Sequence, residues 1–462
     1  MPEFAVPLKH TDLAILGAGP AGLAAATQAR AQGLQVLLLD ENAALGGQVH
    51  RAVGGFYRPD IRAPGATQAR EGLRLIEAAQ ASGAEMRQGA TLWAIERDGT
   101  ITWSEAGTAH QARARRLLLC PGATERALPI PGWTLPGVMG VGAAQILLKT
   151  AGLLPEGRVW MAGQGPLLWL YAAQILAKGG TIAGIIDLSP RGAWRRAALH
   201  LPRALTAPGY LAQGLAWMWR VRRAGIPVIR AETLEALGEN RLRAIRFDAR
   251  EAAADLLLLH DGVVSNTQLT RALPGCAHEW DGRLACLRPV VDEWGNTSLP
   301  DVMVAGDGAA VGGARAAALS GRIAALEAAR ALGRLSGDQR DALAGQLLLR
   351  RQVELAPRAM LDALYPPLPP ARIADATILC RCEEVTAGRV RAAAALGAQG
   401  PNQLKAFLRA GMGACQGRVC GPLVHAMVAA ERGLDPATMD GLRTRFPSKP
   451  VTVGELASLV QT

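Results

Sequence analysis

The first forty residues carry the pattern that most restricts how this chain can fold. An apolar run at 12–16 is followed by a glycine-rich turn, a stretch of helical composition at 23–32 and a second apolar run at 35–39. The turn reads Gly17-Ala18-Gly19-Pro20-Ala21-Gly22. Strand, Gly-x-Gly-x-x-Gly, helix and strand in this order are the fingerprint of a βαβ unit that binds a dinucleotide. The chain is therefore predicted to open with a parallel α/β sheet.

Each glycine of this turn has a separate task in the predicted site. Gly17 permits the tight turn, Gly19 lets a pyrophosphate approach the backbone, and Gly22 allows the helix to pack closely on the strand. The helix that begins at Pro20 and Ala21 would direct its free N–H groups toward the pyrophosphate. A turn that only connects strand to helix is the alternative, and the complete motif argues against it.

An acidic pair follows the second strand at the position that the fingerprint requires. Asp40 stands about 20 residues after the turn, and Glu41 is beside it. A carboxylate at this position accepts hydrogen bonds from the ribose hydroxyls of a dinucleotide. We expect Asp40 to be best placed for this role, with Glu41 as its neighbour.

A second, damaged version of the motif occurs in the middle of the chain. An apolar run at 158–162 leads into Gly163-Gln164-Gly165-Pro166, and a further strand is expected at 181–187. Leu168 stands where the third glycine should be. Its side chain would push helix and strand apart and crowd a pyrophosphate. NAD(P) binding is therefore doubtful. The middle domain could instead bind another nucleotide, such as ATP or FMN, or no nucleotide.

Four of the seven cysteines lie close together near the C-terminus. They form a Cys-x-Cys pair, Cys380 and Cys382, and a Cys-x4-Cys pair, Cys415 and Cys420. Four thiolates on two tight loops are the ligands that a [2Fe–2S] cluster requires. A four-cysteine zinc site is the alternative that the residues leave open, although zinc commonly uses two Cys-x-x-Cys pairs.

The segments around these cysteines are predicted to be helical. Thr386 is a plausible N-cap for a helix at 387–396, and Asn402 for a second at 403–410. A last helix is expected at 423–432. Upstream, 336–376 is interpreted as a connector that ends in a stiff Pro-rich stretch.

Charge and composition limit the partners and the location of the protein. The net charge is +11, but no block of Lys or Arg stands out, so nucleic-acid binding is not expected. The Trp- and Arg-rich segment 193–225 suits a protein surface better than a membrane-bound helix, so membrane association is expected to be peripheral at most. The apolar run 159–177 contains Gly-Gln-Gly-Pro and is read as a buried strand and helix. Residues 1–10 lack signal-peptide features, and clustered cysteines suit a reducing compartment, which favours the cytoplasm or the inner face of the membrane.

The late segment Ala305-Gly306-Asp307-Gly308, followed by a small-residue helix at 314–332, resembles the glutathione-reductase-like flavoproteins. The resemblance implies FAD as the dinucleotide, with Asp307 on the ribityl chain beside Gly306. It also implies a flavin-side loop at Gly47 and Gln48. Thiol redox catalysis is not expected, because the three remaining cysteines are scattered along the sequence. His50, just after the loop, is interpreted as a hydrogen-bonding structural histidine, and an approach to the flavin is the alternative.

The cysteine segment is similar to the bacterioferritin-associated-ferredoxin-like [2Fe–2S] domain, which implies that Cys380, Cys382, Cys415 and Cys420 ligate the cluster. The order of all motifs, up to the closing 445–451 (Arg-Phe-Pro-Ser-Lys-Pro-Val), resembles the alpha subunits of heteromeric dye-linked amino-acid and opine dehydrogenases. That group includes the corresponding subunits of opine oxidase, hydrogen cyanide synthase and D-hydroxyproline or proline dehydrogenase. The resemblance implies a flavin-containing beta subunit of the amino-acid oxidase type, and often a small ferredoxin-like gamma subunit.

The expected fold is α/β, with two Rossmann-like dinucleotide-binding domains and a small helical C-terminal [2Fe–2S] domain. The predicted boundaries are 10–130 with 285–335 for a discontinuous FAD-binding domain, 131–284 for an NAD(P)-type domain, 336–376 for the connector, 377–432 for the [2Fe–2S] domain and 433–462 for a tail. The expected function is electron transfer from a partner that oxidises a C–N bond, and no catalytic acid or base is identified. The alternatives are a self-sufficient NAD(P)H-dependent reductase and an iron–sulfur carrier or regulatory scaffold.

Overall fold

The predicted βαβ unit forms the centre of a seven-stranded sheet in the N-terminal domain. The computed structural model describes residues 8–53 and 63–461, so most of the segment predicted to lack a signal peptide lies outside the described residues. The sheet order is β3-β2-β1-β6-β5-β4, and β19 pairs with β6. Its elements are β1 (Lys9–Leu16), α1 (Pro20–Ala31), β2 (Val36–Asp40), α2 (Ala66–Ala81), β3 (Glu85–Gln88), β4 (Thr91–Ile95), β5 (Thr100–Glu105), β6 (Thr108–Leu119), β19 (Val302–Val304) and α9 (Ala314–Ala331).

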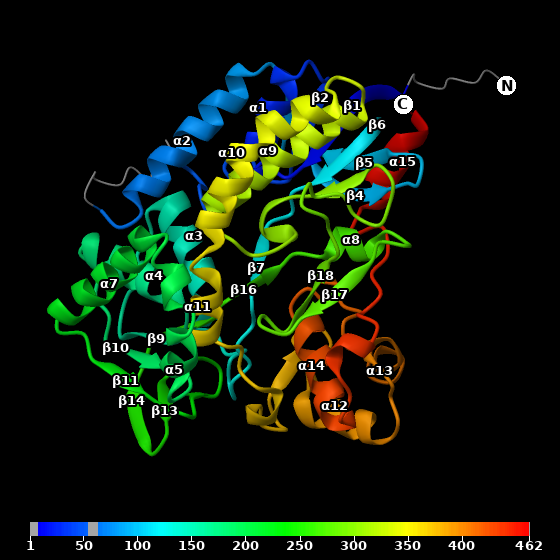
Figure 1. Cartoon of the computed structure of the whole chain (residues 1–462). Coiled ribbons are helices and arrows are strands. Elements are labelled where there is room, and N and C mark those ends of the chain that lie inside the picture. The colour runs from blue at the N-terminus through cyan, green and yellow to red at the C-terminus, as the bar shows by residue number, and fades with distance from the viewer. Residues whose placement is uncertain (1–7, 54–62, 462) are drawn as a thin grey trace.

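Small residues let the helices of this domain pack unusually closely. A Cβ on Gly321 of α9 would lie 2.0 Å from the carbonyl oxygen of Ala21 in α1. The chain therefore returns to the N-terminal domain after the middle domain and lays α9 along α1 (Figure 1). α10 (Gly337–Leu355) in turn packs along α9. The first part of the predicted connector is thus a packed helix of the N-terminal domain.

The middle domain is a second parallel sheet, with order β11-β10-β9-β15-β8. The apolar run at 159–177 divides into a strand and a helix as predicted, because Gly165 and Pro166 separate them. Its main elements are β8 (Val138–Gly140), α3 (Val141–Ala151), β9 (Val159–Gln164), α4 (Pro166–Ala177), β10 (Gly184–Asp187), α5 (Ala193–Ala198), α6 (Leu201–Ala204), α7 (Pro208–Arg223), β11 (Val228–Arg230) and β15 (Leu256–Asp261). A three-stranded antiparallel sheet, β12 (Glu235–Leu237), β13 (Ala244–Phe247) and β14 (Arg250–Ala253), is attached to it. In the described part of the chain, no helix is both long and apolar enough to cross a membrane.

Short antiparallel elements lie between the two sheets and the C-terminal part of the chain. They are β7 (Ala123–Glu125), β16 (Val263–Ser265), α8 (Gln268–Ala272), β17 (His278–Asp281) and β18 (Cys286–Pro289). β7 pairs with β16, and β17 pairs with β18. In Figure 1 these elements separate the N-terminal domain above from the helices at 387–432 below.

The third unit, which we call the cysteine domain, is small and helical. It contains β20 (Ile378–Cys380), β21 (Val385–Thr386), α12 (Ala387–Ala395), α13 (Pro401–Leu408) and α14 (Gly421–Arg432) around its own apolar core. The Thr386 hydroxyl accepts the N–H of Arg389, which confirms the predicted N-cap. The prediction for Asn402 is wrong: α13 begins at Pro401, and the Asn402 side chain instead hydrogen-bonds to Gly441 and Arg443 of the tail.

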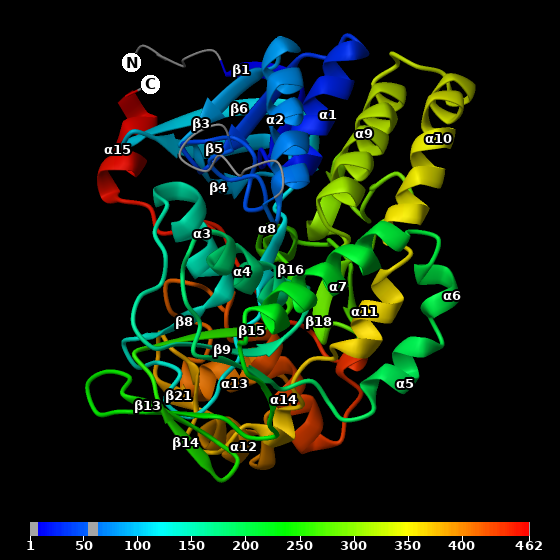
Figure 2. The same cartoon turned by 90° about the vertical axis from the view of Figure 1, so that its left-hand side faces the viewer.

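The tail returns from the cysteine domain to the N-terminal domain. It ends in α15 (Val453–Gln461), which packs on β6 far from α14 (Figures 1 and 2). Ser448 donates its backbone N–H to the carbonyl of Trp93 in β4 across 2.8 Å and is fully buried. The connector is a second link between the cysteine domain and the rest of the molecule. In it, α11 (Arg358–Leu364) leads to the Pro-rich stretch at 365–370. The tail and the connector therefore both join the cysteine domain to the rest of the molecule.

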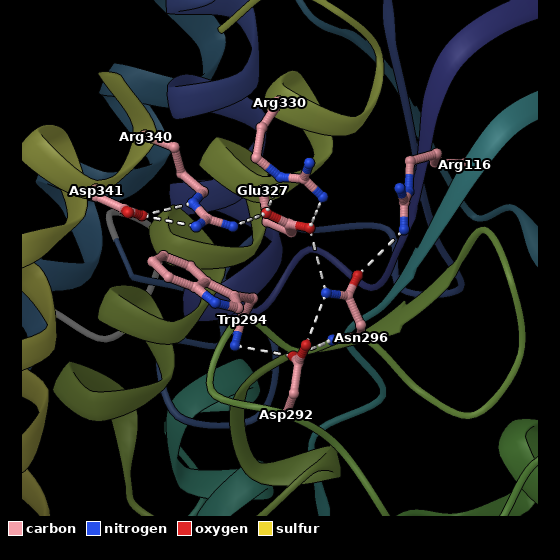
Figure 3. Close-up of polar contacts among 8 residues, drawn as sticks. All are labelled: Arg116, Asp292, Trp294, Asn296, Glu327, Arg330, Arg340 and Asp341. Carbon is pink, nitrogen blue, oxygen red and sulfur yellow. Dashed lines mark hydrogen bonds and ion pairs between the residues drawn. The ribbon is translucent and has the colours of Figure 1, made fainter. Parts of the chain in front are cut away.

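A buried carboxylate joins α9, α10 and the loop before β19 (Figure 3). Glu327 is 2% exposed and accepts hydrogen bonds from Arg330 at 2.7 Å, Arg340 at 2.6 Å and Asn296 at 3.3 Å. Asn296 also accepts a hydrogen bond from Arg116 of β6 at 3.1 Å. Burial acts to raise the pKa of Glu327, but the hydrogen bonds from Arg330, Arg340 and Asn296 outweigh it and lower the pKa to about 2.

We expect Glu327→Gln to lower the free energy of unfolding by about 1.5–3 kcal/mol at pH 7, because the hydrogen bonds of Arg330 and Arg340 lose their charged acceptor. A carboxylate whose pKa is lowered from 4.5 to about 2 on folding stabilises the fold above pH 4.5, and this contribution is lost as the pH falls toward 2. Urea titrations followed by flavin fluorescence should show the difference between variant and wild type shrinking over that interval.

Asp341→Asn is the matched control, because Asp341 binds the same Arg340 but its side chain is 58% exposed. It should cost less than about 1 kcal/mol. Equal stability of Glu327→Gln and wild type at pH 7 would contradict the role given to Glu327.

Candidate cofactor sites

The glycine-rich turn leaves no room for a side chain at two of its glycines. Gly17 has φ +113°, and a Cβ there would lie 2.3 Å from the carbonyl oxygen of Cys120. A Cβ on Gly22 would lie 1.8 Å from the carbonyl oxygen of Gly17. Gly17 is therefore in the backbone conformation that the tight turn needs, and Gly22 is in the close packing that the sequence pattern predicted.

The predicted flavin-side loop lies directly on this turn. A Cβ on Gly47 would lie 2.7 Å from the Cα of Gly19, so two bare backbones face each other where the pyrophosphate is expected. Lys149 of α3 donates hydrogen bonds to the carbonyls of Gln48 at 3.4 Å and Val49 at 3.0 Å, and so holds the loop. Burial, with Arg51 as a second cause, lowers the pKa of Lys149 to about 8. The Gln48 side chain is exposed.

The Gly306–Asp307 segment approaches the same helix start. A Cβ on Gly306 would lie 2.8 Å from the Cβ of Ala21. Asp307 accepts the backbone N–H groups of Gly312 and Gly313 through one oxygen, each at 2.9 Å. Burial raises the pKa of the Asp307 carboxyl, although these hydrogen bonds oppose the rise. The structure thus brings the late segment beside the turn, as the resemblance implied, and the ribityl contact stays a prediction.

The acidic pair after β2 is already engaged within the protein. Asp40 is buried and accepts the N–H of Ala18 at 2.6 Å and that of Asn42 at 2.7 Å, so it holds the turn closed. Glu41 is exposed and forms an ion pair with Lys449 of the tail. Ribose binding by either residue stays a prediction. The sequence analysis missed Lys449, whose only signal was its place in the closing 445–451 segment.

His50 has the structural role that the sequence suggested. It is 1% exposed, and α2 packs so tightly on it that a Cβ on Gly72 would lie 2.4 Å from the imidazole Cγ. Burial, followed by the neighbouring Lys149, lowers the pKa of His50 to about 4. The ring is therefore neutral at pH 7.

The degenerate motif of the middle domain is covered by the connector. Leu168 is 1% exposed and belongs to the apolar core. Gln164 at the end of β9 donates to the carbonyl of Pro366, and Asp261 at the end of β15 accepts the N–H of Leu368 at 3.3 Å. Ligands of such sheets bind at the carboxyl ends of the strands. The Pro-rich stretch lies at that edge.

The four predicted ligands gather at one end of the cysteine domain. Cys380 and Cys420 are buried and close enough to hydrogen-bond, while Cys382 is exposed and lies beside the half-buried Cys415. The N–H of Gly411 points to the sulfur of Cys380 at 3.5 Å. The neighbouring Cys380 thiol and burial raise the pKa of Cys420, and the Cys420 thiol is the main cause that lowers the pKa of Cys380 to about 5.

The cysteines are arranged as two pairs. In the described part of the chain, no three His, Cys, Asp or Glu side chains converge as one metal ion would require. A binuclear cluster needs four thiolates divided between two irons, and two thiol pairs match that donor set. The residues present therefore fit a [2Fe–2S] cluster.

The tail touches both candidate sites within three residues. Gln416 and Arg418, which follow Cys415 in the cluster loop, donate to the carbonyls of Pro447 at 2.9 Å and Ser448 at 3.0 Å. Lys449, the next residue of the tail, reaches Glu41. Sequence reasoning did not foresee this link between the cysteine domain and the dinucleotide-binding turn.

Comparisons with known proteins bear out the two cofactors. Residues 11–152 match the family described as pyridine nucleotide-disulphide oxidoreductase, and residues 378–430 match the BFD-like [2Fe-2S] binding domain. All four cysteines of the two pairs fall in the second match. FAD and a [2Fe–2S] cluster are therefore the cofactors of this chain, and the four cysteines are not a zinc site.

Similarity extends over nearly the whole chain. The A subunit of opine oxidase from Agrobacterium tumefaciens (strain Ach5) is 40% identical, with 98% of this chain and 92% of that protein covered. Hydrogen cyanide synthase subunit HcnB of Pseudomonas aeruginosa is 32% identical, with 96% of this chain and 98% of that protein covered. The structure of L-proline dehydrogenase from P. horikoshii has a TM-score of 0.71 at 18% identity, covering 98% of this chain and 80% of that one.

These findings confirm the expected fold class and an FAD-dependent oxidoreductase. At 18% identity the proline dehydrogenase structure supports the fold alone, whereas the relatives found by sequence are similar enough to show family membership. With 40% identity over 98% of its length, this chain belongs to the family that contains the A subunit of opine oxidase.

Proposed function

We propose that this chain is the electron-transferring subunit of a heteromeric dehydrogenase, in which a partner flavoprotein oxidises the C–N bond of an amino acid, an opine or hydroxyproline. Its relatives are named as subunits of opine oxidase and of hydrogen cyanide synthase, which supports a complex. The partner we infer is a flavin-containing beta subunit of the amino-acid oxidase type. A small ferredoxin-like gamma subunit would be a further member.

One observation carries this proposal: the cluster ligands are buried on one side and exposed on the other. Cys380 and Cys420 are buried in the apolar core of the cysteine domain, and Cys382 is exposed to solvent. When bound, the flavin exchanges one or two electrons and the cluster exchanges one, so together they can split an electron pair. The tail contacts both sites through Pro447, Ser448 and Lys449, and the Cys382 edge is accessible to a partner.

Around this edge the surface suits a docking protein. Met412 is 49% exposed and Val419 is 41% exposed, and both lie in the loop that carries Cys415. Arg409 is paired with Glu383, the neighbour of Cys382, at 2.9 Å. Apolar side chains beside charged ones are typical of electron-transfer contacts that form and separate quickly.

The complex itself provides the direct test. Co-expression with a flavin-containing partner should yield a complex that reduces an artificial dye when supplied with glycine, proline isomers or opines. The isolated chain should reduce no dye with any of these substrates. Substrate-dependent dye reduction by the isolated chain would overturn the proposed division of labour.

We expect Cys382→Ser and Cys415→Ser to abolish or strongly weaken the visible absorption of the cluster while FAD stays bound. The reason is that each removes one thiolate of a pair, whereas the glycine-rich turn lies in another domain. Cys276→Ser is the matched control, because Cys276 is a half-buried free cysteine outside the pairs. Iron and flavin contents of the purified variants give the result, and unchanged iron in both would refute the ligand assignment.

NADH should not reduce the flavin of the purified chain under anaerobic conditions. The Pro-rich stretch lies against Gln164 and Asp261 at the edge where nicotinamide would bind, and Leu168 replaces a required glycine. Bleaching of the flavin absorbance within seconds would instead favour a self-sufficient NAD(P)H-dependent reductase.

A further inference from the structure

A small cavity lies between the flavoprotein part of the molecule and the buried side of the cluster site. Its volume is about 30 Å³, enough for one or two water molecules. Gly417 and Gly421, which flank the cluster ligand Cys420, line one wall. Ser265 of β16 and Arg271 of α8 line the other.

This cavity joins the two cofactor sites. The Ser265 hydroxyl donates a hydrogen bond of 2.7 Å to the backbone carbonyl of Asp307, the residue expected on the ribityl chain. Across the cavity stand the residues next to Cys420, which is 2% exposed. A connection through described residues therefore runs from Asp307 through Ser265 and the cavity to Gly421, the residue next to Cys420.

Three buried polar atoms that belong to residues lining the cavity have no partner among the described residues. They are Nε of Arg271, Oε1 of Gln268 and Nδ1 of His425. His425 is fixed in place, because its ring stacks on Trp280 with 4.5 Å between centroids and its Nε2 bonds the carbonyl of Pro436 at 2.8 Å. Buried polar atoms without a protein partner, beside a cavity with room for a water, are usually satisfied by a bound water.

Arg271 is a buried cation without a carboxylate. Within the described residues its guanidinium forms no ion pair, and its Nη1 donates to the carbonyl of Leu442 in the tail at 3.0 Å. Leu442 in turn packs on the cluster loop, since a Cβ on Gly417 would lie 2.2 Å from its Cδ2. Burial lowers the pKa of Arg271 to about 10, and the Cys420 thiolate opposes this effect. A buried charge with no protein counter-ion is costly unless another charge compensates it.

We infer that Arg271 is the fixed positive charge that raises the reduction potential of the cluster, and that the water-filled cavity beside it connects the cluster to the flavin site. This inference rests on the proposed relay function. A [2Fe–2S] core with four thiolates is anionic and gains one more negative charge on reduction. A nearby cation stabilises the reduced form more than the oxidised form, and the effect is largest where water is excluded. Arg271 would thus act on the cluster through its charge, by raising the reduction potential.

The decisive experiment separates the charge of Arg271 from its hydrogen bond. Arg271→Lys keeps the charge, whereas Arg271→Gln keeps a donor for the Leu442 carbonyl and removes the charge. The reduction potential of the cluster is measured in the purified chain, with both cofactors bound, by a redox titration monitored by electron paramagnetic resonance. We expect the potential of Arg271→Gln to move to more negative values and that of Arg271→Lys to stay near wild type, with the flavin potential unchanged in both.

Arg409→Gln is the matched control. Arg409 also lies beside a cluster ligand, but its side chain is 66% exposed and paired with Glu383, so solvent and its partner screen its charge. Its removal should leave the potential almost unchanged. A wild-type potential in Arg271→Gln, an equal shift in Arg409→Gln, or equal loss of the cluster from Arg271→Gln and Arg271→Lys would each overturn the inference. Because no partner or substrate is needed, failure here is distinct from failure of the relay proposal.

Discussion

Close backbone approach around the start of α1 is the constraint on which the rest of the structure depends. Gly22 seats α1 against the turn, and Gly321 seats α9 against α1, each at a distance that no side chain would permit. Because α9 follows the late Gly306–Asp307 segment, the same contact brings that segment to the dinucleotide-binding turn. Glu327 then fixes the far end of α9 to α10 through Arg340 and, by way of Asn296 and Arg116, to β6. The FAD site is thus a product of helix packing between parts of the chain separated by the whole middle domain.

The middle domain has the architecture of a nucleotide-binding unit, but the chain uses its binding edge to hold another domain. Gln164 and Asp261 hold the Pro-rich stretch, and Trp133 donates to the carbonyl of Ile378 in β20 at 2.7 Å. Tyr365, the first residue of the stretch, lies near Asp187 at the end of β10, where a ribose-binding acid would act. The amide of Gln164 and the carboxylate of Asp261 at this edge are therefore hydrogen-bonded to the backbone of the connector. This explains how a degenerate motif can persist with a structural purpose.

Local patterns in the sequence were enough to predict the βαβ unit at the start of the chain, the strand and helix at 159–177 and the helical character of the cysteine domain. The glycine-rich turn, the division of 159–177 into β9 and α4, and the Thr386 cap all depend on neighbours a few residues apart. The errors and omissions involve long-range contacts. Asn402 has the chemistry of an N-cap, but the tail competes for its side chain about 40 residues further on. Lys449 meets Glu41, and Ser265 meets Asp307, across separations that leave no periodicity or spacing to read. Such contacts exist only once the domains have docked.

Charge and burial differ between the two sides of the cluster site. On its inner side lie two buried thiols, a cavity with unpartnered polar atoms and an arginine without a carboxylate among the residues that the structure describes. Its outer side has an exposed thiol and a screened surface ion pair. Electrostatic stabilisation of added negative charge is stronger where water is excluded, so the inner side is the one that the protein controls. The outer side, open to solvent, is the one that a partner can reach. Under the proposed relay function, a partner would therefore exchange electrons with the cluster at this exposed edge, while the buried side sets the electrostatic environment of the cluster.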